Sequence, residues 1–171
     1  MSDILVVYYS RKGENYMPGG IQVLEKGHTE RAAEFIRDAL DADLFEIDTV
    51  APYAENYKEC CAQAVAEMKA NARPEIRAFV EDISRYSTIF VCFPCWCGTS
   101  PMCVFTFLEH YDLTGKKIIP LCTNEGSGMA NAVGDLERSC KNAAVLPGLA
   151  ILGHQVECSK GAITSWAQSQ I

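Results

Sequence analysis

The chain has 171 residues, of which 49% are apolar and 22% are charged, and its formal net charge is −7. This length and composition suffice for one core of ordinary size, so we expect a single domain over residues 1–171. The negative charge argues against nucleic acid or an anionic membrane surface as the main partner. No apolar run approaches the roughly 20 residues of a membrane-spanning helix, so we expect no membrane insertion.

Nine cysteines raise the question of disulfide bonds. Their number is odd, and the opening residues MSDILVVYYS have an acid before the apolar run instead of the basic start of an export signal. We therefore expect a cytoplasmic protein in which most thiols are reduced and act as small apolar side chains.

Five apolar runs predict strands, over residues 4–9, 43–47, 88–93, 117–122 and 149–152. Most are apolar without alternation, which is typical of parallel strands that are covered on both faces. Helical periodicity predicts helices over residues 29–40, 57–72, 76–83, 101–110, 129–140 and 163–167. Thr29 is the expected N-cap of the first helix, and Pro101 suits the first turn of another. The alternation of strands and helices predicts a doubly wound α/β fold, and residues 11–28 form a long glycine-containing segment without an assigned element.

In such a sheet, ligands bind just beyond the carboxyl ends of the strands, and three of these ends carry unusual loops. The first loop combines polar groups and cations with a helix N-terminus, which suits a phosphate. Its candidate groups are Ser10, Arg11, Lys12, Asn15, Tyr16, Lys26 and Thr29. Neither GxxxxGK[ST] nor GxGxxG is present, so the sequence carries no nucleoside-triphosphate loop and no dinucleotide fingerprint.

The second loop, PCWCGTSP, places Trp96 beside Gly98 and Thr99, and the third, TNEGSG, allows close approach of backbone amides. Each loop alone is equally compatible with an ordinary turn. Together, a phosphate cradle, an aromatic wall and a polar backbone loop predict a site for a phosphorylated, planar aromatic ligand.

Two other interpretations use the cysteines of the second loop. Cys92 and Cys95 form a C-x-x-C pair, but Cys92 lies within an apolar strand and not at a helix N-terminus, where a catalytic thiol is activated. A metal site built from Cys92, Cys95 and Cys97 lacks the second ligand pair that structural zinc uses. His110 and His154 are expected to be structural or solvated.

These motifs, in their order, resemble the flavodoxin family, in particular flavodoxin-like proteins with a PxWxGT loop. The resemblance covers nearly the whole chain through VVYYS, GHTERAAEFI, DLFEI, FPCWCGTSPMCVFTFLE and IIPLCTNEGSGMANAVGDL. It implies a flavodoxin-like three-layer sandwich, with a five-stranded parallel sheet of order 2-1-3-4-5, that binds FMN non-covalently. The residues implied in FMN binding are Ser10, Arg11, Asn15, Tyr16, Gly27, His28, Thr29, Pro94, Cys95, Trp96, Cys97, Gly98, Thr99, Thr123, Asn124, Glu125, Gly126 and Gly128. Residues 11–26 depart from the usual compact phosphate loop, and Cys97 stands where many relatives carry a second Trp.

The resemblance implies electron transfer through the flavin, with no catalytic side chain and no metal. The implied partners are redox proteins, namely a reductase and an electron acceptor, or a small quinone-type acceptor. The alternatives are an NAD(P)H-dependent flavin or quinone reductase of the same fold, a C-x-x-C thiol redox protein, and a variant that has lost FMN. Glu125 and the net charge are expected to disfavour an anionic reduced flavin, with a merely solvated Glu125 as the open alternative.

Overall fold

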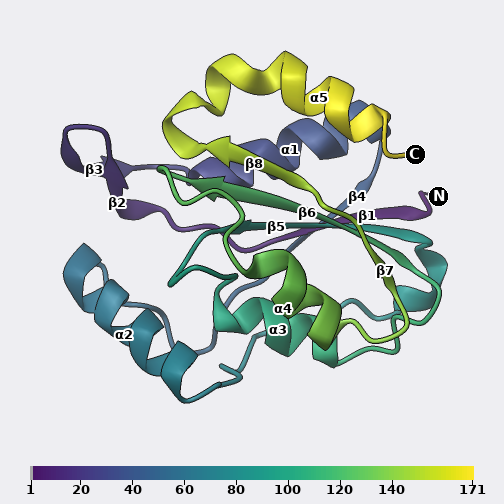
Figure 1. Ribbon diagram of the computed structural model, residues 1–171, viewed down its shortest axis with the longest axis horizontal. Coiled ribbons are helices and arrows are strands. Elements are labelled where there is room, and N and C mark those ends of the chain that lie inside the picture. Colours follow the sequence, from purple (N-terminus) through teal and green to yellow (C-terminus); the bar gives the residue numbers. More distant parts are fainter. Residues whose placement is uncertain (1) are drawn as a thin grey trace.

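The apolar runs of the sequence form the central sheet of the computed structural model, which describes residues 2–171 (Figure 1). The strands of this sheet are β1 (Ile4–Tyr8), β4 (Asp43–Glu46), β5 (Thr88–Pro94), β6 (Lys117–Asn124), β7 (Ala144–Val145) and β8 (Leu149–Leu152). Their order is β4-β1-β5-β6, with β7 and β8 both paired to the outer edge of β6, and every pairing is parallel. With β7 and β8 as the fifth strand, this is the predicted order 2-1-3-4-5, so the predicted fold class is confirmed.

The fifth strand is divided opposite Pro120. Pairing to the edge of β6 ends at Ile118 and resumes at Leu121. Proline has no N–H to donate to a strand ladder, so the pairing is interrupted there. Gly148 lies against Pro120 at this break and has a φ of 76°. A Cβ at this position would lie only 2.2 Å from the carbonyl oxygen of Pro120, so a side chain does not fit.

Helices cover both faces of the sheet (Figure 1). The helices α1 (His28–Leu40) and α5 (Lys160–Gln168) lie on one face, and α3 (Met102–Glu109) and α4 (Ala132–Ser139) lie on the other. Because successive side chains of a strand point to opposite faces, each face has its own apolar core. Leu5 and Val7 pack in the core under α3, and Val6 and Tyr8 in the core under α1. The helix α2 (Tyr57–Lys69) lies beside α3, at the carboxyl end of the strands.

The segment between β1 and α1 forms a β-hairpin that the sequence did not predict. Its strands are β2 (Gly13–Met17) and β3 (Gly20–Leu24), which pair antiparallel. The hairpin projects from the carboxyl end of the sheet (Figure 1), and Val23 is 76% exposed. Its strands contain glycine and polar residues and face solvent, so the alternation that marks a half-buried strand is absent.

Several predicted helix bounds require correction. The helix expected over residues 76–83 is wrong: Ile76 forms an isolated bridge to Thr49, and only a 3-10 turn, Ile83–Arg85, follows. The backbone of this segment instead bonds to the loop after β4, through Val50 N to Glu75 O at 2.9 Å. The helix expected to start at residue 129 begins at Ala132.

The first helix also begins earlier than expected. α1 starts at His28 with Gly27 as its N-cap, so Thr29 is a helical residue and not the cap. Among residues 2–171, no helix is both long and apolar enough to cross a membrane.

Candidate functional site

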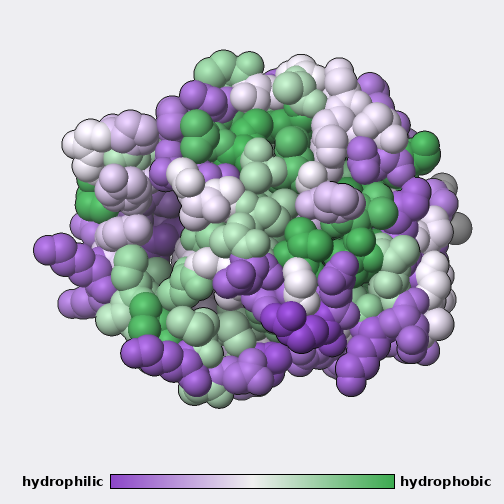
Figure 2. All heavy atoms as spheres, in the orientation of Figure 1, coloured by the Kyte–Doolittle hydropathy of each residue, from purple (hydrophilic) through white to green (hydrophobic). Residues whose placement is uncertain are grey.

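The loops after β1, β5 and β6 meet around one cavity of about 130 Å³ at the carboxyl edge of the sheet. Figure 2 shows the surface hollowed between the hairpin and the rest of the molecule. The predicted residues that line the cavity are Arg11, Asn15, Tyr16, His28, Pro94, Cys95, Trp96, Thr123, Asn124 and Glu125. The structure therefore brings side chains from all three predicted loops together.

The remaining predicted residues do not line the cavity, but some of them form hydrogen bonds that join its loops. Ser10 accepts a hydrogen bond from the backbone N–H of Glu30 at 3.1 Å, which ties the end of β1 to α1. The hydroxyl groups of Thr29 and Thr123 lie 2.7 Å apart and join the first loop to the third. The residues that do not line the cavity are Ser10, Gly27, Thr29, Cys97, Gly98, Thr99, Gly126 and Gly128.

Two lining residues were missed by sequence reasoning, Tyr57 and Gly153. Tyr57 is the first residue of α2, and its ring stacks on Tyr16 with a centroid separation of 6.4 Å. At Gly153 a Cβ would lie 2.7 Å from Cδ2 of His28 and 2.8 Å from Oε1 of Glu125. Neither position carries a local sequence signal, because both reach the cavity only through the packing of distant loops.

The start of α1 provides a close-fitting cradle at the first loop. A Cβ on Gly27 would lie 2.1 Å from Oγ of Ser10 and 2.6 Å from the carbonyl oxygen of Arg11, so only glycine fits. Gly27 has no side chain to cap α1, and Ser10 takes the N–H of Glu30, which leaves the N–H groups of His28 and Thr29 without a side-chain partner. These groups and the positive end of the helix suit an anion such as a phosphate.

The cations of the first loop have different roles. The guanidinium group of Arg11 donates to the carbonyl oxygens of Glu14 at 2.8 Å and Glu55 at 2.7 Å, and it lines the cavity. Lys26 instead binds the carboxylate of Glu34 at 2.6 Å on the outer face of α1. Because the carboxylate of Glu14 also accepts from the backbone N–H of Tyr57 at 2.6 Å, the hairpin is fastened to the start of α2.

The loop after β5 is a tight turn around Cys97 and Gly98. Trp96 N–H donates to Thr99 O at 2.8 Å, and Thr99 N–H donates back to Trp96 O at 3.0 Å. The two central residues have left-handed φ angles of 54° and 76°. Trp96 packs edge-on against two tyrosines of the core, with centroid separations of 5.2 Å to Tyr9 and 4.9 Å to Tyr53. The turn thus fixes an indole ring in the wall of the cavity.

The loop after β6 is held by one side chain. Oδ1 of Asn124 accepts from the N–H groups of Gly126 at 2.9 Å and Gly128 at 3.0 Å, and its Nδ2 donates to Ile151 O at 3.1 Å. These three bonds fix the path of a glycine-rich backbone next to the cavity.

Glu125 is not a solvated loop acid. Its Oε1 accepts from the backbone N–H of His154 at 2.9 Å, and its Oε2 lies 2.5 Å from Nδ1 of the same residue. His154, expected to be structural or solvated, therefore anchors a side chain of the site. Burial lowers the pKa of the neighbouring His28, which keeps that imidazole neutral at pH 7.

The two cysteines of the C-x-x-C pair lie on opposite faces of the sheet. Cys92 is fully buried in the core under α1, and burial raises the pKa of its thiol. Cys95 packs against the other core and lines the cavity. Across residues 2–171, no cluster of three or more His, Cys, Asp or Glu side chains has the arrangement of a metal site.

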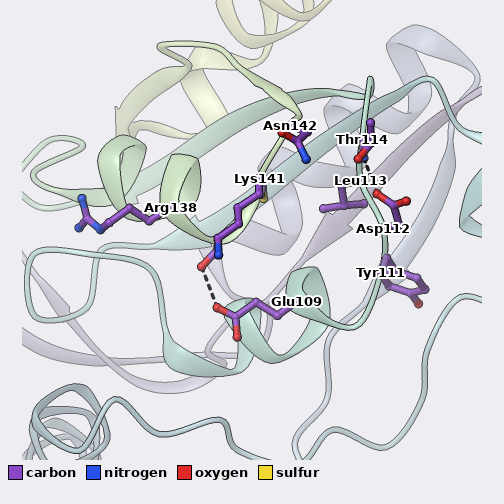
Figure 3. Close-up of a pocket in the computed structure, with 10 residues that line it drawn as sticks. Glu109, Tyr111, Asp112, Leu113, Thr114, Arg138, Lys141 and Asn142 are labelled. Carbon is purple, nitrogen blue, oxygen red and sulfur yellow. Dashed lines mark hydrogen bonds between the residues drawn. The ribbon is translucent and has the colours of Figure 1, made fainter.

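A larger groove, of about 410 Å³, lies at the opposite end of the sheet, before the amino ends of β6 and β7 (Figure 3). Two acids, Glu109 and Asp112, share it with Arg138 and Lys141. None of the predicted site residues lines it. Glu109 pairs with Arg73, and Arg138 pairs with Asp135.

The parallel sheet, the three converging loops and the cradle at α1 define a flavoprotein-like α/β protein. The family model for flavodoxin matches residues 23–170, so the chain belongs to the flavodoxin family. This membership confirms the predicted family and FMN as the expected cofactor. No curated protein sequence matches the chain.

Solved structures show the same fold over nearly the whole chain. A candidate flavoprotein from Bacteroides eggerthii is 27% identical, with a TM-score of 0.73 over 97% of this chain and 96% of that chain. A second, from Bacteroides uniformis, is 25% identical, with a TM-score of 0.76 over 96% of this chain and 97% of that chain. A flavoprotein from Lactobacillus acidophilus, solved in complex with FMN, is 21% identical, with a TM-score of 0.67 over 91% of this chain and 96% of that chain.

Proposed function

We propose that this chain holds FMN non-covalently in the cavity at the carboxyl edge of the sheet and transfers electrons to and from redox partner proteins. A small quinone-type molecule is the alternative acceptor. The convergence of the loops after β1, β5 and β6 on one cavity carries this proposal. The FMN complex of the similar protein from Lactobacillus acidophilus supports it.

The residues present fit an FMN phosphate at the start of α1. The cradle at Gly27 brings the backbone of Arg11 close to the first turn of the helix. Ser10 occupies the N–H of Glu30 in that turn, and the N–H groups of His28 and Thr29 remain for the phosphate oxygens. The Arg11 guanidinium adds a positive charge to the cavity lining.

The flavin ring system of FMN would then lie between the loop that contains Trp96 and the loop that contains Asn124. Bound FMN supplies one- and two-electron redox chemistry, while the chain orients it and sets the local charge. The cavity, at about 130 Å³, is smaller than the roughly 300–1,000 Å³ of enclosed ligand pockets. A flavin in it therefore keeps an edge at the surface, where a partner protein can approach.

The two tryptophans of the chain allow a sharp test. Trp96 lies in the cavity wall, whereas Trp166 on α5 packs edge-on against Phe90 in the core under α1. FMN added to the purified protein is expected to show flavin bands at about 375 and 450 nm and to lose its own fluorescence. In Trp166→Phe, the remaining emission from Trp96 should be strongly quenched by FMN; in Trp96→Phe, emission from Trp166 should be quenched less. Absence of FMN binding, or equal quenching in both variants, contradicts the proposed site.

A second measurement separates a carrier from a reductase. In stopped-flow mixing with NADPH, an electron carrier shows no fast bleaching of the flavin band unless a partner reductase is present. Fast bleaching by NADPH alone would instead establish the NAD(P)H-dependent reductase of the same fold, with the FMN site unchanged.

A further inference from the structure

The hairpin of β2 and β3 has two edges, and only one of them is covered. At the edge of β2, the carbonyl oxygen of Glu14 accepts from the guanidinium of Arg11 at 2.8 Å. The carboxylate of Glu14 accepts from the backbone N–H of Tyr57 at 2.6 Å and ties this edge to α2. Across residues 2–171, by contrast, no backbone group of β3 bonds to a partner outside the hairpin. β3 is therefore an unpaired edge strand on a projecting hairpin (Figure 1).

The register of the hairpin identifies the free groups of this edge. In an antiparallel pair, hydrogen-bonded and non-hydrogen-bonded residue pairs alternate along the strands. The turn at residues 18–19 contains two residues, so its closing pair, Met17 with Gly20, is of the hydrogen-bonded type. The alternation then turns the N–H and C=O groups of Ile21 and Val23 away from β2. These groups form the open edge.

Nothing in β3 blocks the approach of another strand. Natural edge strands are usually protected by charged side chains, proline or a bulge. β3 reads GIQVL, without charge or proline, and its pairing with β2 contains no bulge. Its apolar side chains face solvent, with Ile21 46% exposed and Val23 76% exposed. Because a two-stranded ribbon alone is only marginally stable in water, an added strand would stabilise the hairpin.

The open edge is complementary to itself. When β3 is placed antiparallel to its own copy, with a twofold axis at Gln22, Ile21 of each copy lies opposite Val23 of the other. Each of these pairs is then of the hydrogen-bonded type, so every outward N–H and C=O group of the two edges has a partner. The side chains of Ile21 and Val23 form apolar pairs across the new strand boundary, which add to the stability of the pairing.

The charges near β3 also permit this register. Residues 15–24 carry no charged side chain. Glu25 and Lys26 follow β3, and the twofold axis places them opposite the uncharged turn at residues 18–19 of the second copy. No like charges therefore face each other across the strands. A twofold axis meets all these conditions at once, which makes a second copy of this chain the occupant that the edge fits.

We propose that β3 pairs with β3 of a second copy of this chain and joins the two hairpins into a four-stranded antiparallel sheet across a homodimer. The interface goes beyond electron transfer through a flavin and does not depend on it. The same hairpin supplies Asn15 and Tyr16 to the cavity at the carboxyl edge, so pairing holds these side chains in place in both protomers. Because two five-residue strands form a small contact, we expect a dissociation constant on the order of 10–100 µM.

Sedimentation equilibrium of the purified full-length protein tests the dimer, in a reducing buffer that prevents disulfide cross-links. The wild type should pass from monomer to dimer between about 5 and 500 µM. Val23→Lys should weaken the association at least about tenfold, because an edge lysine blocks strand pairing. Val50→Lys is the matched control: Val50 is 41% exposed in the loop after β4, and this variant should associate like the wild type. A wild type that stays monomeric, or a Val23→Lys variant that associates equally well, overturns the proposal.

A cross-link tests the register of the pairing. On the twofold axis, Gln22 faces its own copy in a non-hydrogen-bonded pair, whose Cα atoms lie about 4.5 Å apart, within the range of a disulfide. Gln22→Cys should therefore give a covalent dimer under mild oxidation, with the linked peptides identified by mass spectrometry. Glu25→Cys is the control, because the two copies of this position lie about 20 Å apart along the paired strands and should not link. No linkage at position 22, or equal linkage at position 25, contradicts the twofold pairing.

Discussion

The two ends of the sheet carry cavities of opposite character. The cavity at the carboxyl edge measures about 130 Å³, whereas the groove at the amino edge measures about 410 Å³. At the carboxyl edge α1 begins, and the N–H groups of its first two residues, His28 and Thr29, have no side-chain cap. At the amino edge α3 and α4 end, so the negative ends of two helices face the groove.

This difference is the reason why we propose the smaller cavity as the cofactor site. Free N–H groups and loops from three strands give the carboxyl edge donors for an anionic cofactor. At the amino edge, the acids Glu109 and Asp112 and the negative ends of two helices disfavour an anionic cofactor. Our proposal for the functional end of this molecule therefore rests on backbone polarity and strand direction, and not on the volume of a cavity.

The largest expected effect at the carboxyl edge is that of Gly27→Ala. The new Cβ would lie 2.6 Å from the carbonyl oxygen of Arg11, which cannot move without the first loop. We expect the strain to be about 1–3 kcal/mol and FMN affinity to fall about tenfold, measured by quenching of FMN fluorescence. Gly161→Ala in α5 is the matched control, because nothing lies within 4 Å of its Cβ. An FMN affinity in Gly27→Ala equal to that of wild type would be evidence against the phosphate cradle.

A second large effect is expected from Asn124→Ala, which removes the three hydrogen bonds that fix the loop after β6. The backbone groups left without partners should cost about 1–3 kcal/mol of the free energy of unfolding, measured with urea, and FMN binding should weaken. Asn124→Asp keeps both acceptor bonds to the glycine N–H groups and loses only the donor to Ile151. Its stability should therefore lie between those of wild type and Asn124→Ala, and a variant no more stable than alanine contradicts this account.

The fold was predictable from the sequence because buried parallel strands leave continuous apolar runs. The runs at 88–93 and 117–122 identified β5 and β6, and strand direction then placed their loops at one edge. The hairpin at residues 13–24 was not predictable, since its solvent-facing strands have no apolar periodicity. The segment 76–83 has helical periodicity, but backbone bonds to the loop after β4 replace the helix.

The site was predictable at the level of loops but not of contacts. The residues next to strand ends, such as Trp96 and Asn124, were found because loop position alone brings them to the edge. The pairing of Glu125 with His154 joins residues 29 positions apart in sequence. No local pattern encodes such contacts.

Glu125→Gln tests the electrostatics of the carboxyl edge with a smaller expected effect. Removal of this carboxylate should make an anionic reduced flavin less unfavourable and raise the midpoint potential of the fully reduced step. The shift should be on the order of tens of millivolts, because the carboxylate accepts a hydrogen bond from the backbone N–H of His154 and solvent screens its charge. Redox titration of the FMN-loaded protein measures it. An unchanged or lowered midpoint contradicts a role for Glu125 in setting the potential.

Glu109→Gln is the corresponding change at the amino edge and should have the smallest effect. A hydrogen bond from Arg73 is the main cause that lowers the pKa of Glu109 in the folded protein. The ionised carboxylate of Glu109 therefore stabilises the fold at pH 7, and this stabilisation is lost as the pH falls through the lowered pKa. Since both partners are partly exposed, the variant should lose only about 0.2–1 kcal/mol of unfolding free energy at pH 7, measured with urea. The difference from wild type should vanish at a pH below the lowered pKa, where the carboxyl group is protonated. FMN affinity should not change, because Glu109 lies at the end of the sheet away from the cofactor cavity. A loss of FMN affinity in Glu109→Gln would show that the two ends of the sheet are energetically coupled. The separate cavities and the opposite helix ends give no reason to expect such coupling.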